Sequence, residues 1–145
     1  MEEQVEVILR GGQFKMLLEK QLLGIREKYG LKRIEVEVLY FLSRCGQSNT
    51  STDIHRHLKM NKGHISQAVD SLCKQGYLVA AADMEDRRYV HYSITGKADV
   101  LIQDMTETWK KINQKVFEGI TEEELSSFKE TAIKIGKNME RILGE

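Results

Sequence analysis

The sequence predicts a mainly helical protein with one small β-hairpin, an α+β fold. Apolar residues recur at helical spacing along most of the 145 residues, and no proline interrupts them. Two short helical patterns follow one another between residues 50 and 76. Directly after them the apolar period shortens to two residues, which indicates strands. These observations predict the order helix, turn, helix, hairpin, enclosed between longer helices.

The first long helix is predicted over residues 5–29. Its apolar side carries Phe14, Leu17, Leu18, Leu22 and Ile25. The adjacent Gly11 and Gly12 cost about 2 kcal/mol relative to alanine in a helix, so we expect a kink or a late start there. Gly30 is the expected end of this helix.

Residues 34–44 fit two structures. The run I-E-V-E-V alternates as in a strand, and its β-branched residues agree with that assignment. The continuation L-Y-F-L-S-R and the stop at Gly46 favour a helix. The residues alone leave both open, with the helix favoured.

Two short helices are predicted next. Thr50 is placed to cap the first, with Asp53 three residues later, and Ile54 and Leu58 give it an apolar face. Asn61 is a good N-cap for the second, which ends at Gly76. The buried stripe of the second helix is Ile65, Ala68, Val69 and Leu72, with Tyr77 placed to pack beyond its end.

A hairpin is predicted after Gly76. Leu78, Ala80 and Ala82 share one face of the first strand, and Val90, Tyr92 and Ile94 share one face of the second. The tip, residues 83–88, reads D-M-E-D-R-R. An exposed arginine on a projecting hairpin suits the narrow minor groove of DNA, where the potential is most negative. Helix, turn, helix and arginine-bearing hairpin together describe a winged helix-turn-helix.

Two further long helices complete the chain. Thr95 is placed to cap a helix that reaches about Glu118, with Gly119 as its terminator. The residues T-E-E-E at 121–124 form a capping box that opens a last helix, whose apolar face persists to the end of the chain.

At these residues the chain resembles the MarR family of bacterial transcription factors. The resemblance depends on D-I-H-R-H-L, on the helix at residues 61–76 with its K-Q-G-Y-L-V end, and on Asp86, Arg88, Ile94 and Thr95. It covers nearly the whole chain. It implies that the second short helix enters the major groove, that Arg88 enters the minor groove, and that Asp86 steadies Arg88. His55 and Lys59 depart from the small residue and the glycine that the family favours there.

The second short helix, residues 61–76, is the predicted recognition helix. Its polar residues point away from Ile65, and helix-turn-helix proteins read bases with the first half of this helix. Gln67 suits adenine, while Lys62 and His64 suit guanine or phosphate. Thr50 and Ser51 are placed to bind phosphate at a helix N-terminus. The predicted DNA contacts are Thr50, Ser51, Lys62, Gly63, His64, Ser66, Gln67, Asp86, Arg87 and Arg88.

The net charge of zero does not by itself favour DNA. Residues 50–98, however, carry 7 basic and 5 acidic side chains and all four histidines, whereas residues 99–145 carry 7 basic and 10 acidic. A dimer would double the positive contacts. No apolar run reaches the roughly 18 residues of a membrane span, and the acidic start differs from a signal peptide, so we expect a cytoplasmic protein.

We expect a single domain of residues 1–145, in which residues 1–30 and 96–145 form a dimerisation body and residues 31–95 form the winged DNA-binding region. The terminal helices are too apolar for a winged core of about 45 residues to cover, so a homodimer is expected rather than a monomeric bundle. The resemblance also implies a small aromatic or phenolic effector in a cleft. Candidate cleft residues are Phe14, Tyr40 and Trp109, for which core packing is the alternative.

Other functions are weighed against this one. The sequence has no common catalytic motif, so no enzyme and no cofactor are expected. His55 and His57 face different directions on a helix, and no metal site is expected. Cys45 and Cys73 form no C-x-x-C pair, and a redox-sensing regulator is an alternative. A winged helix used only for protein contacts is another.

Overall fold

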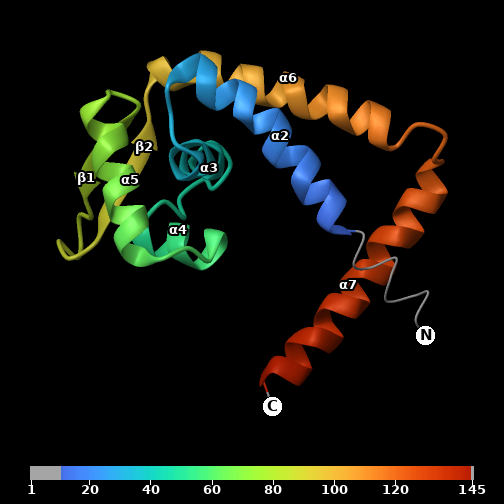
Figure 1. Cartoon of the computed structure of the whole chain (residues 1–145). Helices are drawn as coiled ribbons and strands as arrows, with labels where there is room; N and C mark the ends of the chain where they lie inside the picture. The colour runs from blue at the N-terminus through green and yellow to red at the C-terminus, as the bar shows by residue number, and fades with distance from the viewer. Residues whose placement is uncertain (1–10, 145) are drawn as a thin grey trace. The chain divides into compact units, whose positions relative to one another are not determined.

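The computed structural model describes residues 11–144 (Figure 1). The chain divides into two compact units within helix α6, Met1–Thr108 and Trp109–Glu145. Among the described residues, no helix has the length and apolar character that crossing a membrane requires. The elements are α2 (Gly11–Tyr29), α3 (Arg33–Leu42), α4 (Ser51–Leu58), α5 (Lys62–Lys74), β1 (Leu78–Ala82), β2 (Val90–Ile94), the 3₁₀ helix η1 (Gly96–Ala98), α6 (Asp99–Val116) and α7 (Glu122–Gly144).

The core of the first unit lies where α3, α4, α5 and the hairpin meet. The segment that fitted both a strand and a helix is the helix α3. The helix is favoured because it directs five side chains of this segment into the core, whereas a strand would bury only alternate side chains. The core of the first unit contains Val36, Val38, Leu39, Leu42, Ile54, Ile65, Ala68, Val69, Leu72, Tyr77, Leu78, Ala98 and Leu101, each less than a tenth exposed. The predicted stripe of α5 is therefore confirmed.

The hairpin forms a two-stranded antiparallel sheet, as predicted. Leu78 pairs with Ile94, Ala80 with Tyr92 and Ala82 with Val90, so the predicted apolar positions lie on one common face. Only Leu78 in this set is fully buried. The hairpin is thus packed at its base and projects from the unit as a wing (Figure 1). A single β-bridge between Thr50 and His91 joins β2 to the start of α4.

The helix ends follow the predicted capping chemistry. Thr50 and Asp53 form the reciprocal cap of α4, and the Asn61 side chain accepts from the backbone amides of Gly63 and His64 at 2.7 and 3.4 Å. Gly76 ends α5 with φ of 81°. Lys59, in place of the expected glycine, adopts the same left-handed region with φ of 53°. The turn therefore forms without glycine, at the expense of local strain.

His55 also departs from the family pattern without disturbing the core. Its Nδ1 atom lies 2.6 Å from the carbonyl oxygen of Met60, so the ring folds back over the turn between α4 and α5. The larger side chain is accommodated beside the turn, where a polar ring can reach a backbone group.

Thr95 occupies the predicted N-cap position, at the start of the short helix η1 that leads into α6. Its side chain makes no cap hydrogen bond there. Its hydroxyl donates instead to the carbonyl oxygen of Gly76 at 2.6 Å. Gly76 lies just beyond the end of α5, so this hydrogen bond joins the start of η1 to the turn after α5.

Helix α2 is described from Gly11, and the predicted helix residues 5–10 lie outside the described residues. Ile25 is buried, whereas Met16 and Leu23 are exposed. At its end, Lys28 Nζ lies 2.6 Å from Asp104 Oδ2 on α6, and the Tyr29 hydroxyl donates to the same carboxylate. These hydrogen bonds hold the pKa of Asp104 below its usual range.

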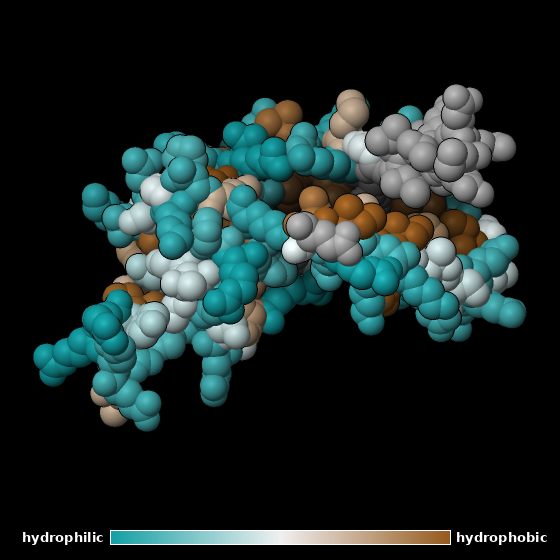
Figure 2. Space-filling model, turned by 90° about the horizontal axis from the view of Figure 1, so that it is seen from below, coloured by the Kyte–Doolittle hydropathy of each residue, from teal (hydrophilic) through white to brown (hydrophobic). Residues whose placement is uncertain are grey.

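The second unit contains the end of α6 and all of α7. The predicted capping box is present, because the Thr121 amide donates to Glu124 Oε2 at 2.9 Å and the Glu124 amide donates to Thr121 Oγ1 at 3.2 Å. No residue of α7 is buried. Its apolar side chains reach the surface, and Figure 2 shows such uncovered hydrophobic residues in brown. The exposed large apolar residues of α7 are Phe128, Ile133, Met139, Ile142 and Leu143.

Candidate nucleic-acid interface

The outward face of α5 is polar. Burying Ile65 and Val69 turns the other side of the helix to solvent, and all five predicted contact residues of α5 are exposed. They are Lys62, Gly63, His64, Ser66 and Gln67. A Cβ atom at Gly63 would lie 3.0 Å from the Asn61 side-chain oxygen, which caps the helix. The absence of a side chain at position 63 therefore protects the cap and also leaves the backbone open to a ligand.

The C-terminal end of α5 is held by a buried carboxylate that was not predicted from the sequence. Glu35 is only 3% exposed, and its Oε2 atom accepts from Ser71 Oγ at 3.0 Å and Gln75 Nε2 at 2.9 Å. Its Oε1 atom accepts from the Lys32 amide at 3.0 Å. The one signal in the sequence is an acidic residue at the third position of α3, which suits a cap. Its partners on α5 become visible only in the folded chain.

The end of α5 is also tied to the segment that follows the wing. Lys97 Nζ donates to the carbonyl oxygen of Gln75 at 2.6 Å and lies 4.5 Å from the centre of the Tyr77 ring. A cation at a helix C-terminus complements the helix dipole. Sequence reasoning gave Lys97 no role. These contacts fix the recognition helix at the end opposite its predicted base-reading half.

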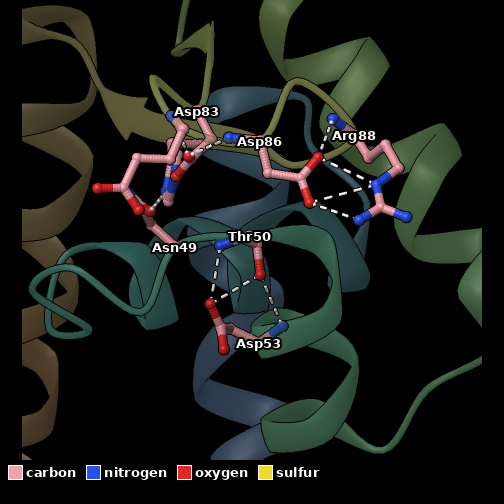
Figure 3. Close-up of polar contacts among 8 residues, drawn as sticks. Asn49, Thr50, Asp53, Asp83, Asp86 and Arg88 are labelled. Carbon is pink, nitrogen blue, oxygen red and sulfur yellow. Dashed lines mark hydrogen bonds and ion pairs between the residues drawn. The ribbon is translucent and has the colours of Figure 1, made fainter.

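The wing presents an arginine held by one carboxylate. Arg88 Nε donates to both oxygens of Asp86 at 3.0 and 3.2 Å, and Nη2 donates to Oδ2 at 2.8 Å (Figure 3). The Arg88 amide donates to the same carboxylate at 3.1 Å. The Arg88 guanidinium lowers the pKa of Asp86, so this carboxylate stays ionised. The structure thus contains the Asp86–Arg88 pair that the resemblance implies. The Arg88 side chain is 86% exposed.

A second polar cluster lies at the base of the wing tip. His91 Nε2 donates to Asp83 Oδ2 at 2.7 Å, and His91 Nδ1 lies 2.5 Å from Asn49 Oδ1 (Figure 3). Asp83 Oδ1 accepts from the amides of Glu85 and Asp86 at 2.8 and 2.9 Å. The His91 contact, followed by these amides, lowers the pKa of Asp83 to about 2. Neither Asp83 nor His91 was a predicted site residue, because their pairing needs the hairpin register.

The N-terminus of α4 is already capped by side chains of the protein, which leaves fewer groups free to bind phosphate. Thr50 Oγ1 donates to Asp53 Oδ2 at 2.7 Å and accepts from the Asp53 amide at 3.2 Å (Figure 3). Thr50 and Ser51 are both half-buried. The Thr50 hydroxyl is therefore already used within the cap, and the Asp53 carboxylate adds negative charge there. Backbone amides remain the groups most suited to a phosphate at this position.

The candidate cleft residues lie in different parts of the chain. Tyr40 is half-buried on α3, with the Arg44 guanidinium 5.0 Å from its ring centre. Trp109 is half-buried on α6 and begins the second unit. The side chain of Phe14 lies outside the described part of the chain. Because Trp109 is half-buried, truncating it would create a smaller cavity than truncating a fully buried tryptophan.

The cysteines have the character of inert thiols. Cys45 and Cys73 are both half-buried and unpaired in any disulfide. Burial raises the pKa of each thiol, which lowers the fraction of reactive thiolate. This environment does not favour the redox alternative. Within residues 11–144, no group of three or more His, Cys, Asp or Glu side chains is arranged to hold a metal ion.

Comparison with known proteins identifies the class of domain that carries these residues. A family model described as a winged helix DNA-binding domain matches residues 31–98. The solved transcriptional regulator PA3341 is 26% identical, with a TM-score of 0.73, over 90% of this chain and 98% of that one. FabT from Streptococcus pneumoniae, solved in complex with DNA, is 17% identical, with a TM-score of 0.74, over 98% and 99% of the two chains. No curated protein sequence matches the chain.

A third solved structure, CouR from Rhodococcus jostii RHA1 bound to p-coumaroyl-CoA, is 20% identical, with a TM-score of 0.68, over 86% of this chain and 87% of that one. Residues 31–98 therefore match a winged helix DNA-binding domain, in agreement with the fold. Further solved structures of this fold are MarR family transcription regulators. The chain therefore has the fold of these regulators, as the resemblance implied.

Proposed function

We propose that this protein is a homodimeric transcription regulator that binds specific double-stranded DNA. The observation that carries the proposal is that one winged-helix domain exposes both a polar recognition face on α5 and an arginine held at the wing. A helix in the major groove and an arginine in the adjacent minor groove together read sequence and groove width. The FabT structure in complex with DNA supports this choice of ligand.

The contacts divide by chemistry. Gln67 has the amide that pairs with the edge of adenine, while Lys62 and His64 donate to guanine or to phosphate. Gly63 and Ser66 allow close approach of the helix. Arg88 and its neighbour Arg87 supply positive charge at the wing, and Asp86 orients Arg88 without touching the DNA. At α4, the amides near Thr50 and Ser51 bind phosphate.

The dimer follows from the uncovered helices. Helix α7 buries no residue within the chain, although five of its large apolar side chains are exposed. Such a surface on a soluble regulator marks an interface. We propose that residues 1–30 and 96–145 form the dimerisation body around residues 31–95. A two-fold dimer places two recognition helices one helical turn of DNA apart and doubles the basic contacts.

We further propose that the protein is a repressor that a small effector releases. CouR binds p-coumaroyl-CoA, which is an aromatic ligand in a protein of the same fold. A small aromatic or phenolic compound is therefore the first class to test, with Tyr40, Trp109 and Phe14 as candidate cleft residues. An effector would act by favouring a dimer whose recognition helices no longer match the spacing of the DNA. Operator DNA in a bacterial cell lies in the cytoplasm, where such a regulator acts.

Fluorescence anisotropy tests the DNA proposal. The purified protein is titrated with labelled duplex from the promoter region of its own gene and with a duplex of shuffled sequence. We expect the promoter duplex to bind at least about a thousandfold more tightly at physiological salt, and both affinities to fall steeply as salt rises. Equal, salt-independent binding or none would instead favour a winged helix used for protein contacts.

A further inference from the structure

We propose that His91 is a positioning residue that sets the geometry of the wing arginine through a series of carboxylates. The inference rests on the proposed DNA-binding role of Arg88. His91 lies on β2, three residues after Arg88, and it does not contact the guanidinium. Its influence passes through Asp83 and Asp86, each of which makes a distinct set of hydrogen bonds.

The first step ties the wing to the body of the domain. The His91 ring lies between Asn49 Oδ1, at 2.5 Å, and Asp83 Oδ2, at 2.7 Å. Asn49 immediately precedes the cap of α4, and its carbonyl oxygen also accepts from the Tyr92 amide at 3.0 Å. The imidazole therefore links Asn49, which lies 42 positions before His91 in the sequence, to Asp83, the first residue of the wing tip.

The second step orders the loop. Asp83 uses its other oxygen to accept from the amides of Glu85 and Asp86, while its own amide donates to the Tyr89 carbonyl oxygen at 2.9 Å. An aspartate that accepts from amides two and three residues ahead stabilises a tight turn. The orientation of Asp86 is thereby set from Asp83.

The third step aims the arginine. The Asp86 carboxylate accepts hydrogen bonds from Nε and Nη2 of Arg88 and from the Arg88 backbone amide. With an exposed fraction of 86%, the Arg88 side chain is held by this carboxylate and not by packing. Holding a long side chain in its bound geometry reduces the entropy lost on binding. His91 thus contributes to DNA affinity although it is not itself one of the predicted contact residues.

The two aspartates make the inference testable against simple electrostatics. Removing a negative charge beside DNA should strengthen binding if charge alone matters. If Asp83 serves to orient the wing, Asp83→Ala should weaken binding instead. We expect a loss of about fivefold for Asp83→Ala and a similar loss for His91→Ala, within the range of coupling through a hydrogen-bonded network.

The test measures affinity for one duplex, the promoter fragment, in a double-mutant cycle of His91→Ala and Arg88→Ala on the full chain. Ser93→Ala, an exposed change on the same strand, is the matched control and should bind as the wild type does. In the Arg88→Ala background, we expect His91→Ala to have no further effect. Thermal unfolding checks that each variant is folded, and Asp83→Ala carries the test if His91→Ala is not.

The outcomes separate this inference from the proposed function. Unchanged affinity in Arg88→Ala would remove the DNA-binding role of the wing and the inference with it. Weaker binding in Arg88→Ala, together with wild-type affinity in His91→Ala or tighter binding in Asp83→Ala, would overturn the positioning role alone. Full additivity of the two losses would also overturn it, because His91 would then act independently of Arg88.

Discussion

The helices of the winged region and helix α7 are both amphipathic, but only the winged region buries its apolar side chains within the chain. In the winged region, the apolar faces of α3, α4 and α5 meet, and Val36, Leu39 and Ile54 are completely buried. In α7, which is longer than any of them, no residue is buried. Amphipathic spacing therefore identifies the apolar face of a helix. Only the folded structure shows whether other parts of the same chain bury that face. The winged region covers its apolar faces within the chain, whereas α7 does not.

The sharpest way to test this contrast is to truncate a leucine in each region. Leu39→Ala removes a fully buried side chain from the winged core and should lower the free energy of unfolding by about 3 kcal/mol. Leu143→Ala on α7, where the residue is 86% exposed, should change it by less than about 0.5 kcal/mol. Urea unfolding of both variants at low protein concentration measures the difference. Equal losses would mean that α7 has its own internal core.

The proposed role of α7 in dimerisation is tested by placing a charge on the apolar face of this helix. Phe128 is 66% exposed, and aromatic residues commonly anchor interfaces. Phe128→Lys should weaken self-association by about thirtyfold, equivalent to about 2 kcal/mol. Glu130→Lys introduces the same residue at an exposed polar position and is the control. Sedimentation equilibrium gives the dimer constants. A wild-type chain that stays monomeric at all concentrations would refute the dimer.

A third variant separates DNA binding from assembly. Arg88→Ala should weaken binding to the promoter duplex by about tenfold and leave dimerisation and thermal stability unchanged, because the side chain is exposed. Arg87→Ala is the matched control. Arg87 has no side-chain partner among the described residues, so it should lose only the threefold or so expected of an unoriented surface charge. Equal losses would show that the Asp86 contact adds nothing.

A small stabilisation is expected within the winged region. Lys59 adopts a left-handed backbone conformation that is unfavourable for a residue with a Cβ atom. Lys59→Gly relieves this strain but increases the entropy of the unfolded chain, and the balance should raise the free energy of unfolding by about 0.5 kcal/mol. Thermal unfolding measures it. A decrease in stability would mean that the Lys59 side chain has a structural role of its own.

The smallest effect concerns pH. The folded-state pKa of Asp83, about 2, lies below its ordinary value of 3.8. The carboxylate therefore stabilises the fold above about pH 4, and this contribution is lost as the pH falls towards 2. The difference in Tm between wild type and Asp83→Asn should accordingly shrink on acidification from pH 6 to pH 3. A constant difference would show that the ionised form of Asp83 is not the one that matters.

Local chemistry made most of the fold predictable. The caps at Thr50, Asn61 and Thr121 and the stop at Gly76 each depend on a few neighbouring residues, and the structure contains all of them. Thr95 lies at the predicted cap position, but its hydroxyl donates to the Gly76 carbonyl oxygen and makes no cap hydrogen bond with η1. Residue spacing alone does not show which of these hydrogen bonds the Thr95 hydroxyl makes.

The site was predictable to the extent that it is local. Arg88 and Asp86 are two residues apart, so their pairing follows from a short motif. Glu35 with Gln75 and His91 with Asn49 join positions 40 and 42 residues apart. Such contacts depend on how the helices and strands meet, and no periodicity in the sequence encodes them. The residues that fix α5 and the wing in place were therefore missed. The exposed residues of the candidate interface on α5 and the wing were predicted.

Chemical footprinting with dimethyl sulfate tests the central claim most directly. This reagent methylates guanine N7 in the major groove and adenine N3 in the minor groove, so it reports each groove separately. On the promoter duplex we predict N7 protection in two major-groove segments about 10 base pairs apart, and flanking N3 protection that Arg88→Ala abolishes. Protection in a single segment, or N3 protection that persists in Arg88→Ala, would contradict a dimer that reads DNA with α5 and the wing.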